Sequence, residues 1–167
     1  MINKSQIAAS MARECDICKH LHEKLTPAAY SFKPSEKQRG TVELLQYVAI
    51  CGIAAIQSLY QSNWKVFGDY YARVKDLKPE DFPAAMDRQK QEIHEFFDGI
   101  TEHTLETRDA LLPVGGTQLL GQAILDLPFK WLPAYKLQLF LYAKMTGSTE
   151  IGTVNAWMGM DWKPSKS

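Results

Sequence analysis

The sequence predicts an all-α fold, an up-and-down bundle of four long helices in a single domain that covers residues 1–167. Apolar residues recur at helical spacing in four long segments, and no segment keeps the alternation that is typical of a β-strand. Hydrophobic residues make up 46% of the chain and charged residues 23%, which is ordinary for a globular domain of 167 residues with one buried core.

The first two helices are predicted over 5–25 and 41–62, separated by a connector that contains Pro27 and Pro34. The apolar stripe of the first consists of Ile7, Met11, Cys15, Cys18, Leu21 and Leu25. The second is apolar on two neighbouring faces, one centred on Leu45 and Ile56 and the other on Tyr47 and Ala54. A helix with so much apolar girth packs against neighbours on more than one side.

The third helix is predicted to begin near Pro83, after short turns and loop over 63–81. A connector over 101–116 leads to the fourth helix, 117–146, in which Pro128 and Pro133 predict a kink or a break. The predicted buried row of this last helix is Leu120, Ile124, Leu127, Trp131, Tyr135, Gln138, Tyr142 and Met145. The tail, 148–167, is expected to lie against the bundle.

Charge and hydropathy exclude several classes of function. Lys plus Arg and Asp plus Glu are both 19, so no basic excess draws the protein to nucleic acid or to an anionic membrane. The longest nearly apolar run, 47–56, is much shorter than the roughly 20 residues of a membrane span, and the N-terminal segment has no signal-peptide core. We therefore expect a cytoplasmic protein in which the three cysteines are reduced.

Two stretches resemble the DinB/YfiT-like superfamily of four-helix bundles. The segment 31–49, with Pro34, Arg39 and the run Glu43-Leu44-Leu45, is similar to the start of that family's second helix. The segments 112–116 and 120–125 are similar to its Pro-Gly loop and the opening of its last helix. Further similarity to the end of that helix lies at Lys136, Gln138, Leu139, Leu141, Tyr142, Met145 and Gly147. The resemblance covers about 5–157 and implies the same bundle.

The resemblance also implies a divalent metal held by three histidines, one on the second helix and two at a spacing of four on the last. At those positions this chain has Tyr47, Trp131 and Tyr135. Its four histidines, at 20, 22, 94 and 103, lie elsewhere in the sequence. A neutral phenol is a poor ligand and an indole N–H only donates, so we expect no metal and no cofactor at this place.

The set Tyr47, Trp131 and Tyr135 leaves two interpretations open. The aromatic side chains either fill the former metal pocket as core, or line a cavity for a small apolar ligand in which two phenol groups orient it. A second motif, Cys15-x-x-Cys18 with His22 on the same helical face, could suggest zinc or redox chemistry. One helical face does not readily wrap a tetrahedral ion, so we expect both thiols to be core residues.

These observations predict a bacterial-type DinB-like protein without the three-histidine metal site, which binds a small molecule or another protein and is not a catalyst. The alternative is an enzyme of the thiol-transferase or isomerase type that works without the usual metal or with a relocated one. In that case Tyr47 or Tyr135 would need a tuned phenol for acid–base chemistry. Catalytic residues remain unknown, and a homodimer is left open.

Overall fold

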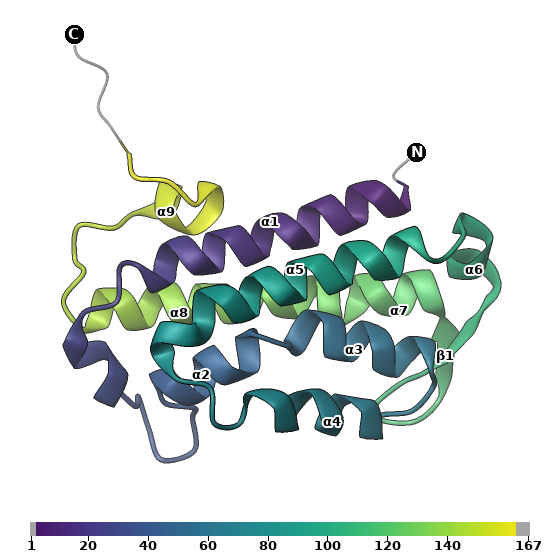
Figure 1. Ribbon diagram of the computed structural model, residues 1–167, viewed down its shortest axis with the longest axis horizontal. Helices are drawn as coiled ribbons and strands as arrows, with labels where there is room; N and C mark the ends of the chain where they lie inside the picture. The colour runs from purple at the N-terminus through teal and green to yellow at the C-terminus, as the bar shows by residue number, and fades with distance from the viewer. Residues whose placement is uncertain (1–2, 163–167) are drawn as a thin grey trace, which may run out of the picture.

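The computed structural model describes residues 3–162 and shows an all-α bundle, as predicted (Figure 1). Its elements, in chain order, are α1 (Lys4–His22), α2 (Thr41–Val48), α3 (Cys51–Tyr60), α4 (Lys65–Val74), α5 (Phe82–Asp98), α6 (Glu102–Thr107), β1 (Asp109–Leu111), β2 (Thr117–Leu119), α7 (Leu120–Asp126), α8 (Pro128–Met145) and α9 (Thr153–Met158). Short 3₁₀ turns occupy Pro27–Ser31 and Pro79–Asp81.

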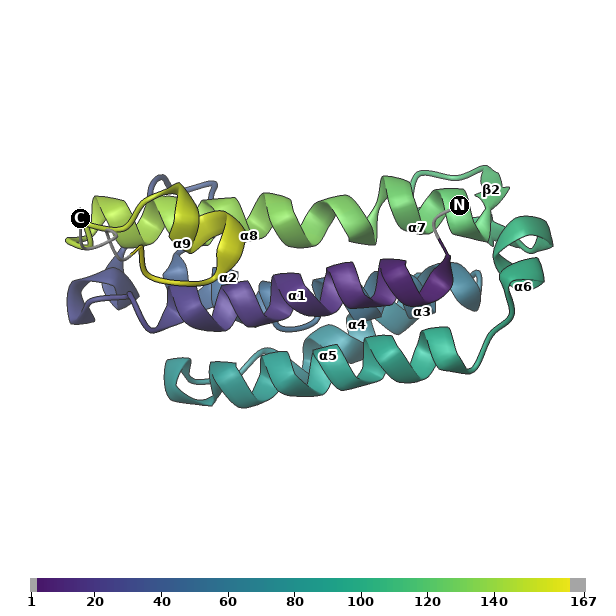
Figure 2. The same cartoon turned by 90° about the horizontal axis from the view of Figure 1, so that it is seen from above.

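Four long helical segments surround one apolar core (Figures 1 and 2). They are α1, the bent pair α2 and α3, α5, and the pair α7 and α8. The predicted stripe of α1 is confirmed, because Met11, Cys15, Cys18 and Leu21 are all buried. The short helix α9 lies across α1 and α8 (Figure 2). It places the end of the described chain on the outside of the bundle.

The direction of the helices differs from a simple up-and-down order. Gln89 of α5 contacts the junction of α2 and α3, and Phe96 stacks on Tyr60 at the far end of α3, so α3 and α5 run parallel. The reason is α4, which carries the chain back along the outside of α3 (Figure 1). The sequence predicted only short turns over 63–81, and this return helix was therefore missed.

The predicted second helix is broken into α2 and α3, which meet at 43°. The side chain of Gln89, 2% exposed, occupies the break. Its Oε1 accepts hydrogen bonds from the backbone N–H of Gly52 and Ile53, at 2.9 and 3.3 Å, and its Nε2 donates to Val48 O at 2.9 Å. One buried amide thus satisfies backbone groups that a helix end leaves without partners.

The break predicted in the last helix is confirmed. Leu127, with φ −114° and ψ −88°, separates α7 from α8, and Pro128 takes the first turn of α8, where its missing N–H costs nothing. At Pro133 the helix is not broken, because α8 continues through this residue to Met145. The core row of α8 differs from the predicted one: Leu132, Lys136, Leu139 and Ala143 are buried, whereas Met145 is 64% exposed.

The connector over 101–116 is more structured than predicted. It contains α6 and the strand β1, which pairs antiparallel with β2 in the register Asp109↔Leu119 and Leu111↔Thr117. Gly115 and Gly116, with φ of 88° and 82°, form the turn of this hairpin. Three residues per strand are too few to produce a visible alternation in the sequence.

Within residues 3–162, no single helix has the length and apolar character needed to cross a membrane. The pair α2 and α3 would meet that criterion if counted together across its 43° bend, and most of its side chains belong to the core of the bundle.

Candidate functional site: an aromatic locus between three helices

Four aromatic side chains from three separate helices meet beside the break between α2 and α3. They are Tyr47 of α2, Phe67 of α4, and Trp131 and Tyr135 of α8, and we call them the aromatic locus. The ring centroids of Tyr47 and Tyr135 are 4.7 Å apart, edge to face. Phe67 lies 5.8 Å from Tyr47 and 6.3 Å from Trp131, so it joins the two sides of the locus. These separations are those of directly packed rings.

The helix α4 covers one side of the locus. It contributes Phe67, and Trp64 directly precedes it. The ring centroids of Trp64 and Trp131 are 6.3 Å apart, and Trp64 Nε1 donates to Leu111 O at 2.9 Å. Val74 is the one fully buried residue of this helix. The helix packs along α3 and α2, and these aromatic contacts join it to α8.

Arg39, in the turn before α2, also borders the locus. Its guanidinium carbon lies 3.9 Å from the ring centroid of Tyr47 and 5.6 Å from that of Tyr135, a cation–π arrangement. The backbone of Arg39 is fixed from α8, because Tyr142 Oη donates to Arg39 O at 2.8 Å and Gln138 Nε2 donates to Tyr142 Oη at 2.6 Å.

The members of the locus are partly buried, neither in the closed core nor on the open surface. Burial raises the pKa of the Tyr47 phenol above its usual range; the neighbouring Cys51 and Tyr135 add to this effect and the Arg39 charge opposes it. The phenol therefore stays neutral at ordinary pH and can donate or accept a hydrogen bond.

The residues of the locus do not fit the divalent metal that the family resemblance implies. A neutral phenol is a poor metal ligand and an indole N–H offers no lone pair in its plane, so Tyr47, Tyr135 and Trp131 supply no anionic or imidazole ligand. Moreover, no group of three or more His, Cys, Asp or Glu side chains in the described part of the chain is placed to hold an ion. We derive no metal chemistry for this site.

The structure brings together the three residues that the sequence singled out. Tyr47 touches Tyr135 directly, and Trp131 joins them through Phe67. The sequence did not predict that Phe67 and Trp64 would join these residues, or that Arg39 would lie over the rings. Those contacts depend on the path of α4 and of the turn before α2, which no local pattern encodes.

The sequence also missed a buried charge. Lys136 of α8 is 1% exposed, and its Nζ lies 2.7 Å from Glu14 Oε2 on α1 and 4.8 Å from the ring centroid of Trp157 on α9. The contact with Glu14 is an ion pair without a well-directed hydrogen bond. The sequence does contain a sign of this burial, because Lys136 lies on the apolar row of the helix between Leu132 and Leu139.

The Cys15-x-x-Cys18 motif is part of the core, as predicted. Both thiols are buried and free, and His22 turns away to Phe82, with ring centroids 5.2 Å apart. Burial raises the pKa of both thiols, which keeps them protonated.

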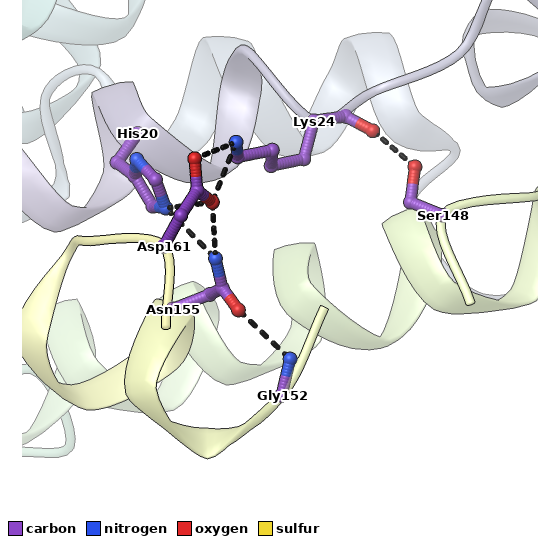
Figure 3. A network of polar contacts seen from close by, with 6 residues as sticks. All are labelled: His20, Lys24, Ser148, Gly152, Asn155 and Asp161. Carbon is purple, nitrogen blue, oxygen red and sulfur yellow. Dashed lines mark hydrogen bonds and ion pairs between the residues drawn. The ribbon is translucent and has the colours of Figure 1, made fainter. Parts of the chain in front are cut away.

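A hollow lies at the C-terminal end of α1. A cavity of about 620 Å³ is lined by Lys24, Glu150, Ile151, Asn155, Asp161 and Trp162, among others. At its edge, Lys24 Nζ lies 2.7 and 2.8 Å from the two carboxylate oxygens of Asp161 (Figure 3). Asn155 Nδ2 donates to Asp161 at 2.9 Å and lies 3.0 Å from His20 Nε2.

This polar network fastens α9 to α1. The Oδ1 atom of Asn155 accepts from Gly152 N at 2.8 Å at the start of α9, and Ser148 Oγ donates to Lys24 O (Figure 3). The hydrogen bond from Lys24 lowers the pKa of Asp161. Lys24 and Asp161 neutralise each other, so the network is a structural clasp between α9 and α1.

Comparison with known proteins supports the fold. No family model matches the chain. The chain is 21% identical over 151 residues to the uncharacterized protein YjoA of Bacillus subtilis, an alignment that covers 90% of this chain and 96% of the relative. The crystal structure of that DinB-like protein superposes with a TM-score of 0.67 over 88% of this chain and 95% of the other. The fold of this chain is therefore the DinB-like fold that the sequence resemblance predicted.

Proposed function

We propose that the protein binds a small organic molecule at the aromatic locus and does not act as a metal-dependent enzyme. One observation carries the proposal: aromatic side chains from α2, α4 and α8 converge on one place and remain partly buried. Phe82 and Phe97, in contrast, fill the core of this protein and are fully buried. Rings that stay partly open offer flat apolar surface to a ligand.

The chemistry of the phenols argues for binding over catalysis. A general base at neutral pH needs a pKa near the working pH, and burial moves the pKa of Tyr47 in the opposite direction. A neutral phenol remains suited to orienting a ligand by hydrogen bonding. No observation in the described residues favours the alternative thiol-transferase or isomerase activity.

The proposal is tested by ¹⁹F NMR of protein labelled with 5-fluorotryptophan and screened against small aromatic and aliphatic compounds. The protein has four tryptophans, and a Trp131→Phe variant assigns the signal of the locus. We expect compounds that shift the Trp131 signal and leave Trp162, far from the locus at the C-terminal cavity, unchanged. Replacing Tyr135 with Ala should abolish those shifts.

Two outcomes would contradict the proposal. In one, binding compounds shift the tryptophans of the C-terminal segment and never Trp131. In the other, elemental analysis of protein purified without a metal-affinity tag finds one tightly held metal ion per chain that is lost in Tyr47→Phe or Tyr135→Phe protein. The second outcome would restore the enzyme interpretation.

A further inference from the structure

We infer that the aromatic locus takes a small carboxylate with an aromatic or other flat apolar body, and that Arg39 binds the carboxylate group. This inference rests on the proposed function, because it names the class of ligand for the same site. The guanidinium carbon of Arg39 lies 3.9 Å from the ring centroid of Tyr47, and Arg39 is an exposed residue.

The guanidinium of Arg39 has unused hydrogen-bond donors. Among residues 3–162, none of the ion pairs and none of the side-chain hydrogen bonds involves it; its backbone carbonyl alone is engaged, by Tyr142. The acidic neighbour Glu43 is occupied elsewhere, since its Oε2 accepts from Gly40 N at 2.7 Å and lies 3.8 Å from Lys33 Nζ. The positive charge beside the locus is therefore not neutralised from within the site.

Two other arginines of the chain lie over tyrosine rings, and the guanidinium of each also has a polar partner within the protein. Arg108 lies 4.3 Å from the ring centroid of Tyr60, and its Nε and Nη2 both donate to Tyr60 O. Arg73 lies 4.1 Å from that of Tyr70, and its Nη1 is 3.8 Å from Glu92. Arg39 has the same stacking without the partner.

The position of Arg39 is fixed before any ligand arrives. The hydrogen bond from Tyr142 holds its backbone, and the cation–π contact with Tyr47 holds the guanidinium over the ring. A planar fork held in this way can pair with both oxygens of a carboxylate, while the ring of the ligand lies along the aromatic side chains of the locus. A neutral ligand would leave the fork unused, and a cation would be repelled.

The test compares three probes by NMR titration of ¹⁵N-labelled protein at millimolar concentration: phenylacetate, its neutral analogue phenylacetamide, and acetate. Wild-type protein should bind phenylacetate about tenfold or more tightly than either of the other two, since hydrogen bonds to a charged group are the stronger ones. In an Arg39→Gln variant, phenylacetate should bind no better than phenylacetamide. An Arg39→Lys variant should recover part of the preference, because it keeps the charge and loses the fork.

Arg73→Gln and Arg108→Gln serve as matched controls, because both remove an arginine that stacks on tyrosine, and both should keep the preference of the wild type. Thermal unfolding checks that each variant is folded. Equal binding of phenylacetate and phenylacetamide by the wild type, unchanged in Arg39→Gln, would overturn the inference and leave the proposed function standing. Binding of neither aromatic probe at the locus would also overturn the inference, and the ¹⁹F screen would then decide the proposed function by itself.

Discussion

The buried pair Lys136 and Glu14 gives a prediction whose size follows from the structure. A Lys136→Met substitution keeps the apolar stem in the core and removes the ammonium group that lies 2.7 Å from Glu14 Oε2. It leaves a carboxylate with one buried oxygen and no counter-charge. Breaking a fully buried pair in this way costs about 3–5 kcal/mol.

The expected cost here is smaller, because the Glu14 side chain is 21% exposed and water reaches part of the carboxylate. We therefore expect about 2–3 kcal/mol from the unpaired charge, and about 0.5–1 kcal/mol more from the lost contact between Lys136 and the ring of Trp157. For a chain of this length, a total of about 3 kcal/mol lowers the melting temperature by about 6–12 °C.

Urea unfolding followed by circular dichroism measures this change, with the slope of the transition as a check on two-state behaviour. The matched control is Lys90→Met, which breaks the pair of Lys90 with Asp16 at 2.6 Å between α5 and α1. Both partners of that pair are about one-third to one-half exposed, so the loss should be within about 1 kcal/mol. The double variant Lys136→Met with Glu14→Met should recover at least half of the lost stability. Equal costs for the two lysine variants, with no recovery in the double variant, would refute the reasoning.

Three further predictions follow from other buried groups. Gln89→Leu leaves buried backbone groups at the break of the helix unpaired and should lower the free energy of unfolding by about 2–4 kcal/mol in urea titrations; a loss below that of a surface substitution would contradict its role. Cys15 and Cys18, whose pKa burial raises, should react with a thiol reagent in native protein far more slowly than in urea; equally fast labelling would place them at the surface. The pKa of Tyr47 is raised above its unfolded value of about 10, so its contribution to stability is complete below that pH and is lost as the pH rises past it. Tyr47→Phe should therefore flatten the decline in stability above about pH 10, and an unchanged slope there would speak against the shift.

The fold was largely predictable because the apolar residues of α1 and α5 keep the period of a helix that is buried on one side. The breaks were predictable in one case and not in the other. Pro128 predicts the end of α7 from the sequence alone, because it has no N–H to donate to a continuing helix. The break after Val48 has no such marker nearby, because the group that stabilises it, Gln89, lies far along the chain on α5.

Some residues of the candidate site could likewise be predicted from the sequence, and others could not. Tyr47, Trp131 and Tyr135 could be placed together because the family resemblance aligned them. Arg39 and Phe67 could not, because their contacts depend on the turn before α2 and on the return helix α4. Lys136 was visible as a charged residue on an apolar row, but its partner on α1 is a tertiary contact that periodicity cannot identify.

The two hydrogen-bonding roles of the Gln89 amide limit which residues related proteins can have at this position. A glutamate at this position could accept from Gly52 N but could not donate to Val48 O, and an aliphatic residue could do neither. Gly52 is constrained as well, since a Cβ there would approach Leu132 Cδ1 to 2.8 Å. A glutamine on the third long helix together with a glycine in the middle of the second is thus a two-residue signature of a bent second helix. Chains that keep both should hold residue 47 at the angle seen in this protein, and chains that lose both are free to run straight.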